Sequence, residues 1–230
     1  MDSMDDFLKA QPPTALRPLL GQTVLAVEDS RYACEAIRLV CLRSGARIRR
    51  ADCLSSARRH LRVYQPSVVL VDLGLPDGSG AELIEELAGV TPRVSVILAM
   101  SGDDALEDNA LSAGADGFLA KPISSIGAFQ SAVLAHVPKE RHPTGPRAIA
   151  EDAIEPDSIA FHDDIAHAQE ALLAGEVSYA AQFIESLALC VGDHALTGRA
   201  QKLARAPESK DEQGKMAAML EHRLGTREAV

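Results

Sequence analysis

One stretch, Val68 to Gly80, constrains the fold of this chain more than any other part of its sequence. Apolar residues run without interruption into Asp72, and the chain then turns through glycines and Pro76 before a helical pattern begins. Consecutive apolar residues of this kind are typical of a strand buried on both faces of a parallel sheet. Since open α/β sheets place their chemistry at the carboxyl ends of the strands, Asp72 is the first candidate site residue.

Three other predicted strands also end in polar residues. In a parallel sheet these ends meet along one edge, so their side chains would share a shallow pocket with Asp72. The polar groups are Glu28 and Asp29 after Thr23 to Val27, Ser101 after Val94 to Met100, and Lys121 after Gly117 to Ala120. The predicted pocket therefore combines carboxylates, a hydroxyl and an ammonium group.

This set of side chains predicts a metal-assisted phosphoryl transfer. Carboxylates that lie close together repel one another, and a hard divalent cation held by oxygen ligands removes that repulsion. Mg2+ fits because it needs few protein carboxylates and keeps open positions for water or phosphate oxygens. Asp72 would then attack phosphorus to form an aspartyl phosphate, while Lys121 and Ser101 bind the phosphoryl oxygens.

These residues resemble the receiver domain of two-component response regulators. The matching motifs, within Gln22 to Val137, are VLAVEDS, VDLGLPDGSG, LAMSG and GADGFLAKP. The resemblance implies a flavodoxin-like fold and a regulatory phosphoacceptor that catalyses only its own phosphoryl transfer and hydrolysis. It also implies individual roles: Mg2+ held by Glu28, Asp29, Asp72 and the backbone carbonyl of Gly74, phosphate accepted by Asp72, the phosphoryl group bound by Ser101 and Lys121, and an aromatic switch at Phe118.

The chain departs from the family pattern in one interval. The spacing from Ser101 to Lys121 is shorter than is usual in the family. Aligned without a gap, Ala99 would take the hydroxyl position, and the switch would lose its hydroxyl. We favour Ser101 with a shortened loop before Asp103, because a Ser-Gly pair directly after an apolar strand has the expected form.

The order of predicted elements indicates two folded units. From residue 21 to 138, strands alternate with helices, which predicts a doubly wound five-stranded parallel α/β sheet with the polar strand Ala46 to Ala51 at an edge. Residues 139–156 are rich in proline and form a predicted linker. Residues 1–20 form a predicted N-terminal extension with a frayed end. From 157 to 230, helical patterns with narrow apolar stripes predict a small all-α bundle.

Part of the helical unit, from Ala171 to Leu196, weakly resembles a histidine phosphotransfer domain. Glu185 stands where the phosphorylated histidine would be, and the Lys-Gly step of that family is absent. The resemblance implies a degenerate domain that cannot relay phosphate, and the alternative is a generic helical bundle with no such kinship. The histidines of this unit lack a phosphoacceptor motif, and we interpret them as exposed helix residues: His162, His167 and His194.

Charge favours an output through protein contacts rather than through DNA. The formal net charge of the chain is −10. Residues 151–230 carry seven basic and fifteen acidic side chains, so most of the negative charge lies in the carboxyl-terminal part of the chain, from Glu151 onward. An acidic surface repels phosphate backbones. The predicted function is a response regulator that a histidine kinase or phosphotransfer protein phosphorylates on Asp72, and that signals through a helical unit that does not bind DNA.

Two other functions remain open at this point. The chain would be a phosphorelay intermediate if the bundle passed phosphate on, and a transcription factor if a recognition helix lay near Arg199 to Arg205. The narrow apolar stripes make a homodimer as reasonable as a complex with an unknown downstream protein. No run of eighteen apolar residues occurs, and the acidic start lacks the basic region of a signal peptide, so we expect a cytoplasmic protein without membrane contact.

Overall fold

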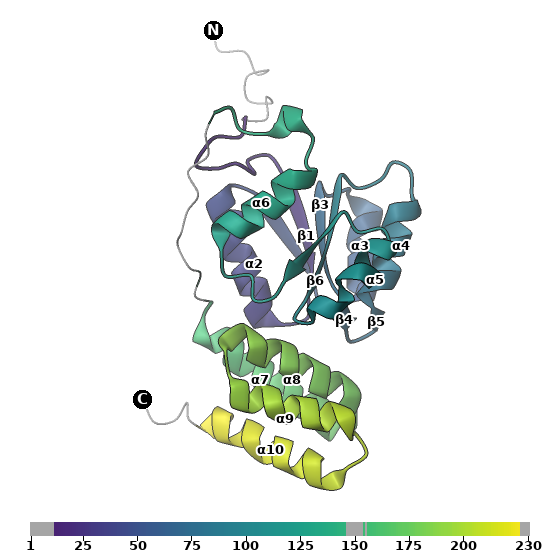
Figure 1. Ribbon diagram of the computed structural model, residues 1–230, viewed down its shortest axis with the longest axis vertical. Coiled ribbons are helices and arrows are strands. Elements are labelled where there is room, and N and C mark those ends of the chain that lie inside the picture. Colours follow the sequence, from purple (N-terminus) through teal and green to yellow (C-terminus); the bar gives the residue numbers. More distant parts are fainter. Residues whose placement is uncertain (1–11, 146–153, 155, 226–230) are drawn as a thin grey trace.

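A parallel sheet forms the centre of the first folded unit. The computed structural model describes residues 12–145, 154 and 156–225, and within them the sheet has the order β2-β1-β3-β6-β7 (Figure 1). Its strands are β1 (Thr23–Val27), β2 (Arg47–Ala51), β3 (Val68–Asp72), β6 (Val96–Ser101) and β7 (Gly117–Ala120). The order confirms the predicted doubly wound five-stranded fold, and it places the polar strand β2 at an edge.

Helices cover both faces of this sheet. One face packs against α2 (Arg31–Ser44) and α6 (Ile126–His136), and the other against α3 (Leu54–Val63), α4 (Gly80–Gly89) and α5 (Glu107–Ser112). Successive residues of β3 enter the two apolar clusters in turn, with Val68 and Leu70 in one and Val69 and Val71 in the other. This alternation explains why the strand is apolar at every position.

Two segments near the site differ in detail from the expectation. The turn after β3 forms a short antiparallel hairpin of β4 (Gly74–Leu75) and β5 (Gly78–Ser79). The helix expected from Asp104 to Ser112 is divided, because a 3-10 turn at Asp104–Leu106 precedes α5. Both segments lie beside the end of the sheet where the candidate residues gather.

The two segments that flank the sheet unit are partly packed against it. Leu19, within the predicted N-terminal extension, is fully buried in the cluster between the sheet and helices α2 and α6. In the predicted linker, Lys139–Arg141 forms a 3-10 turn, and Ile154 N donates a hydrogen bond to Ser124 O at 3.1 Å. The expected frayed end at residues 1–11 and the linker residues 146–153 and 155 lie outside the described residues.

The second unit is a helical bundle, as predicted. Its helices are α7 (Ser158–Leu173), α8 (Val177–Val191), α9 (His194–Arg205) and α10 (Lys210–Gly225). Asp157 caps α7 by accepting a hydrogen bond from Ile159 N at 2.9 Å, and Gly192, with φ of 71°, ends α8. The core of the bundle is separate from that of the sheet unit, and its fully buried members include Ile165, Ile184, Leu196, Leu203 and Leu220.

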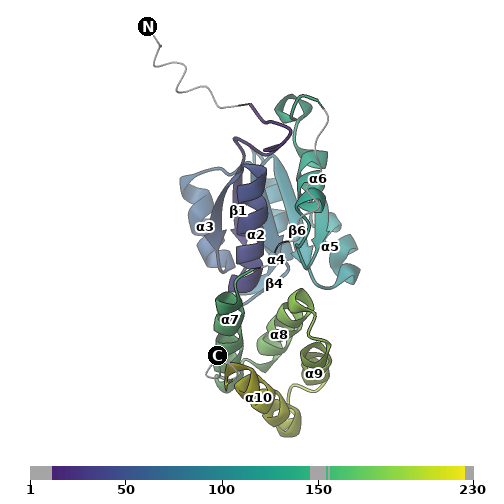
Figure 2. The same ribbon diagram turned by 90° about the vertical axis from the view of Figure 1, so that its left-hand side faces the viewer.

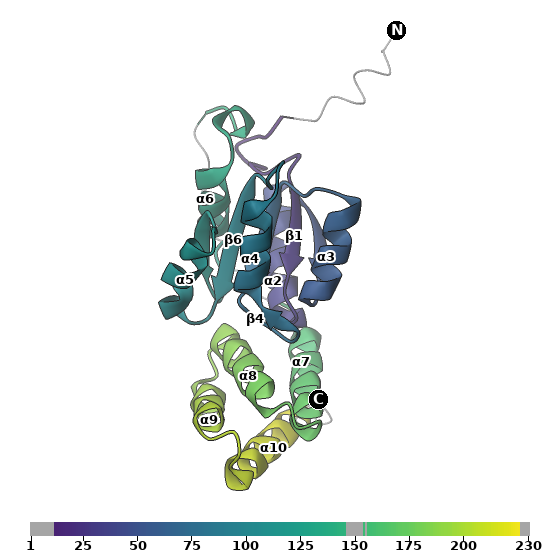
Figure 3. The same cartoon turned by 90° about the vertical axis from the view of Figure 1, so that its right-hand side faces the viewer.

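The bundle lies against the edge of the sheet at which the strands end (Figures 2 and 3). Helices α7 and α8 are next to that edge, and α9 and α10 lie on the far side of the bundle (Figure 1). In the described part of the chain, no helix is long and apolar enough to cross a membrane. The arrangement places the candidate site between the two units.

Candidate functional site

The acidic pair Glu28 and Asp29 lies between the end of β1 and the start of α2. Glu28 is fully buried, whereas Asp29 is half-buried. The chain turns into the helix because Ser30 caps it, with the hydroxyl accepting a hydrogen bond from Ala33 N at 3.0 Å. Ser30 N also donates to Asp29 Oδ1 at 3.0 Å, so the cap fixes the position of this carboxylate.

Asp72 is the last residue of the central strand β3, and 6% of its surface is exposed. The start of α4 packs directly against this strand end because Gly80 has no Cβ: any Cβ there would collide with the carbonyl oxygen of Asp72. Gly74 lies just beyond, in the β4–β5 hairpin. A Cβ at Gly74 would collide with the side-chain amide of Gln182, which comes from helix α8 of the bundle.

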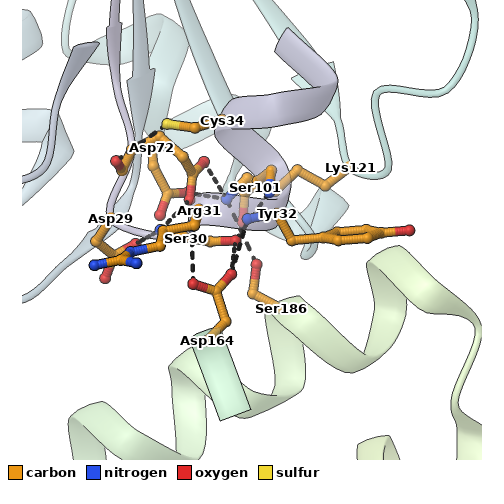
Figure 4. Close-up of polar contacts among 12 residues, drawn as sticks. Asp29, Ser30, Arg31, Tyr32, Cys34, Asp72, Ser101, Lys121, Asp164 and Ser186 are labelled. Carbon is orange, nitrogen blue, oxygen red and sulfur yellow. Dashed lines mark hydrogen bonds and ion pairs between the residues drawn. The ribbon is translucent and has the colours of Figure 1, made fainter. Parts of the chain in front are cut away.

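Lys121 connects two of the carboxylates. Its Nζ lies 2.7 Å from Glu28 Oε2 and 3.0 Å from Asp72 Oδ1, and its side chain is buried (Figure 4). The backbone N of Lys121 donates to Ser101 O at 2.8 Å, which continues the pairing of β6 with β7 beyond the last strand residue. The ammonium group is therefore held at the sheet edge by backbone and side-chain contacts together.

Burial and neighbouring charges together raise the pKa values of Glu28, Asp29 and Lys121. Burial is the main cause that raises the pKa of Glu28 to about 8; the ammonium of Lys121 opposes this, and the charges of Asp72 and Asp29 add to it. Burial and the charge of Asp72 raise the pKa of Asp29 to about 6. Burial alone would lower the pKa of Lys121, but the carboxylates of Asp72 and Glu28 outweigh it, so that pKa lies well above its usual range.

Ser101 lies at the same edge of the sheet, whereas Phe118 pairs with Ala99, two residues before Ser101 on β6. Ser101 pairs with Ala120 across β6 and β7 and lines the same cavity as Asp72. Its hydroxyl accepts a hydrogen bond from Asp103 N at 3.1 Å. Ala99, the alternative candidate, is fully buried in an apolar cluster, and Phe118 is partly buried against that cluster. The strand register thus brings Ser101, and not Ala99, to the pocket.

The structure brings all the predicted site residues to one place except Phe118, which packs beside it. The segment that contains them, residues 24–132, matches the family described as the response regulator receiver domain. Residues 24–132 are a receiver domain. A receiver domain implies an interaction with a histidine kinase or a phosphotransfer partner, and such domains are generally regulatory rather than enzymes that act on other substrates.

The chain is similar to curated transcriptional regulatory proteins and to solved structures of response regulators. The KDP operon transcriptional regulatory protein KdpE of Escherichia coli is 30% identical over 123 residues, which cover 54% of each chain. The probable transcriptional regulatory protein TcrX of Mycobacterium tuberculosis is 36% identical over 104 residues, or 44% of each chain. The chain thus spans about half the length of the curated relatives it matches.

One solved structure, a putative response regulator from Chloroflexus aurantiacus, is 28% identical. The match covers 44% of this chain and 85% of that one, with a TM-score of 0.42. A structure of the Thermotoga maritima response regulator TrrA in complex with Mg2+ and a beryllium fluoride group is 20% identical, with a TM-score of 0.40.

The acidic residues of this receiver domain fit a bound magnesium ion. Receiver domains bind Mg2+ at an acidic pocket, and here Glu28, Asp29 and Asp72 each offer a carboxylate oxygen within 4.8 Å of the others. Oxygen donors at this spacing are the ligands that hard divalent cations prefer. The adjoining cavity of about 480 Å³ offers space for a small phosphate compound.

Part of the site comes from the helical bundle, which the sequence did not predict. The far wall of the cavity is formed by α8 and by one residue from the second half of α9: Gln182, Phe183, Glu185, Ser186 and Leu189 from α8, and Gln201 from α9. Ser186 Oγ lies 3.5 Å from Lys121 Nζ, and Tyr179 donates a hydrogen bond to Asp29 Oδ2 at 2.8 Å. No local motif marks these contacts, because they join residues far apart in the sequence. The sequence singled out only Glu185, from its position in a degenerate motif.

Proposed function

We propose that this chain is a response regulator of a two-component system that is phosphorylated on Asp72. The observation that carries the proposal is the group of Glu28, Asp29 and Lys121 around Asp72 at the end of the central strand. The phosphoryl donor would be the phosphohistidine of a histidine kinase or of a phosphotransfer protein. In this proposal residues 21–138 receive the signal, and residues 157–230 form the output unit beyond the linker 139–156.

The proposed reaction is a displacement at phosphorus. An oxygen of the ionised Asp72 carboxylate attacks, a P–O bond forms, and the bond between phosphorus and the donor breaks. Its electron pair goes to the leaving group, which is the imidazole nitrogen of a phosphohistidine, or acetate when acetyl phosphate is the donor. Lys121, which already contacts Asp72 at 3.0 Å, would pair with the phosphoryl oxygens as they gain charge.

The remaining site residues have supporting roles in this proposal. Glu28, Asp29, Asp72 and the backbone carbonyl of Gly74 would hold Mg2+, which supplies positive charge for the incoming phosphate when it is bound. The Ser101 hydroxyl would donate a hydrogen bond to the phosphoryl group, and Phe118 would turn inward in the phosphorylated state. Each role needs only the side chains or carbonyl already near the pocket.

We propose an output through protein contacts, including self-association, rather than through DNA. The relatives named above are transcriptional regulators, but they match only about half of this chain. The excess of acidic over basic side chains in residues 151–230 disfavours contact with a phosphate backbone. Salt-dependent binding of the full-length protein to duplex DNA would overturn this part of the proposal.

A phosphorelay through the bundle has less support. Helix α8 does face Asp72, but no histidine is among the described residues that line the cavity, and Glu185 accepts a hydrogen bond from Gln201 Nε2 at 2.9 Å. A carboxylate at that position cannot form the phosphohistidine that a relay requires. Acid-labile phosphohistidine on the full-length protein would revive this function.

The direct test is phosphorylation by acetyl phosphate in the presence of Mg2+. We expect wild type to acquire one phosphoryl group in an intact-mass measurement, and Asp72→Ala to acquire none. The matched control is Asp104→Ala, which removes an exposed carboxylate near the same edge and should label like wild type. Equal labelling of Asp72→Ala and wild type would reject the assignment of the site.

A further inference from the structure

The helices α7 and α8 occupy the surface through which a phosphoryl donor must approach Asp72. Asp72, Lys121 and Glu28 are all buried, and residues of the bundle form the opposite wall of the cavity. Figure 4 shows Ser186 and Asp164 of the bundle on the side of the site that Asp72 and Lys121 face. A helix with its side chains is about 10 Å wide, and the position beside Asp72 is already taken by α8. The cavity that remains suits a small molecule but not a helix of another protein.

Asp164 of α7 anchors this contact. Its carboxylate accepts hydrogen bonds from Ser30 Oγ at 2.7 Å, Arg31 N at 2.9 Å and Tyr32 N at 2.9 Å (Figure 4). The first backbone N–H groups of a helix have no partner within the helix, and they carry its positive end. Asp164, with 2% of its surface exposed, therefore serves as the partner of the α2 N-terminus, next to the acidic pair.

Tyr179 and Ser186 of α8 contact the groups that the phosphorylation reaction needs. Both oxygens of Asp29 are engaged, Oδ1 by Ser30 N and Oδ2 by the Tyr179 hydroxyl at 2.8 Å. The Tyr179 hydroxyl is itself 2.9 Å from His167 Nε2, so it is held in place from within the bundle. Ser186 Oγ is 3.5 Å from the ammonium of Lys121. A metal ion on Asp29, or a phosphoryl group on Asp72, would compete for these same atoms.

We infer that the α7–α8 face is a docking surface for the protein's own phosphorylation edge, and that docking and phosphorylation oppose each other. The inference rests on the proposed phosphorylation of Asp72. In the docked state the bundle excludes helical donor proteins. When Mg2+ and the phosphoryl group bind, they draw Asp29 and Lys121 away from Tyr179 and Ser186, and the bundle is released with its α7–α8 face uncovered.

Thermodynamic linkage makes this inference testable with Mg2+ and beryllium fluoride as the phosphoryl substitute. If the ligand shifts the docking equilibrium toward release by some factor, it binds the released state more tightly than the docked state by that same factor. A variant that releases the bundle should therefore bind the ligand more tightly than wild type. The amide protons of Arg31 and Tyr32 report docking directly, because Asp164 is their hydrogen-bond acceptor. On wild type, we expect saturating ligand to speed their exchange by about fivefold or more.

The variant Ser186→Trp places a bulky side chain where α8 meets Lys121 and leaves Asp164 intact. We expect the two amides to exchange rapidly without ligand, and the ligand to bind about fivefold or more tightly than to wild type in calorimetry. The control Ser178→Trp makes the same change at an exposed position of the same helix and should match wild type in both measurements.

The possible outcomes separate this inference from the proposed function. If the ligand binds to neither wild type nor Ser186→Trp, the phosphorylation site itself is wrong and the inference fails with it. If the ligand binds wild type but leaves both amides protected, or binds Ser186→Trp no more tightly, only the docking inference is overturned. Should Ser186→Trp fail to fold, Asp164→Ala with ligand affinity as its readout gives the same decision.

Discussion

The interiors of the two units and the contact between them are built from different kinds of side chain. Each interior is an apolar cluster, with residues such as Leu70 in the receiver domain and Leu196 in the bundle fully buried. The contact adds polar groups, above all Asp164 and Tyr179, to the packing of Tyr32 against Phe161. Water can replace a hydrogen bond at a net cost of about 0.5–1.5 kcal/mol, whereas it cannot replace apolar packing. We therefore expect each unit to stay folded while the contact between the two units breaks and forms again.

The largest effect should come from a cavity in the receiver interior. Ile97 of β6 is fully buried in the cluster beneath α4, and Ile97→Ala should lower the free energy of unfolding by about 2–5 kcal/mol. Urea denaturation followed by circular dichroism measures this change. Val90→Ala, at a position with 51% exposure, is the control. A loss for Ile97→Ala no larger than that of the control would mean that the interior is not the main source of stability.

A smaller effect should follow from removing the anchor of the contact. Asp164→Ala leaves three donors at the start of α2 without their acceptor, and it should lower the stability of the docked state by about 1–3 kcal/mol. The matched control is Asp163→Ala on the same helix, which loses a partly exposed ion pair to Arg31 and should cost about 1 kcal/mol or less. Thermal unfolding of both variants compares them, and equal losses would contradict the role of Asp164 as anchor.

The same contrast explains how far the sequence could predict this molecule. Buried strands such as β3 can be recognised in the sequence by their consecutive apolar residues. Because parallel strands end at one edge of the sheet, the polar residues that follow different strands can be predicted to lie together at that edge. Glu28, Asp72 and Lys121 were therefore predictable as a group. For Ser101, sequence spacing left Ala99 as an alternative, and the pairing of Ser101 with Ala120 then placed Ser101 at the edge.

The contact between the units left no comparable signal in the sequence. Asp164 is 134 residues from Ser30, and Tyr179 is 150 residues from Asp29. An aspartate or a tyrosine on an amphipathic helix can face water as readily as it can face another domain. Neither residue therefore stands out in the sequence until the positions of the helices are known. The prediction of a bundle was sound because it depended on periodicity, but which face it would present depended on tertiary contacts.

The stabilisation of the protein by Mg2+ should depend on pH, because the carboxylates that would bind the ion lie at the contact between the two units. The pKa of Glu28 is raised from 4.5 to about 8, so the stability contributed by its protonated form is fully present below about pH 4.5 and is lost as the pH rises through about 8. Bound Mg2+ offsets the charge that appears, and at ten times its Kd it should add about 1.4 kcal/mol. The rise in Tm caused by Mg2+ should therefore be larger at pH 8 than at pH 6.

Glu28→Gln is the control for this dependence, because it cannot gain the charge. Its Tm should respond less to Mg2+, and the remaining dependence on pH should follow Asp29, whose pKa of about 6 lies lower. An Mg2+ effect in wild type that is the same at both pH values would show that proton release from these carboxylates is not linked to metal binding.

The smallest effect should come from the single hydroxyl that joins α8 to the acidic pair. Tyr179→Phe removes the donor to Asp29 Oδ2 and keeps the ring that packs against Phe183. If the hydroxyl competes with Mg2+ for Asp29, the variant should bind Mg2+ more tightly by up to about 1 kcal/mol, or about fivefold, in calorimetry. Tyr64→Phe, a change of the same kind away from the cavity, should leave the affinity unaltered. Weaker binding by Tyr179→Phe would instead mean that the hydroxyl positions Asp29 for the metal, and that the polar contact supports the site rather than opposing it.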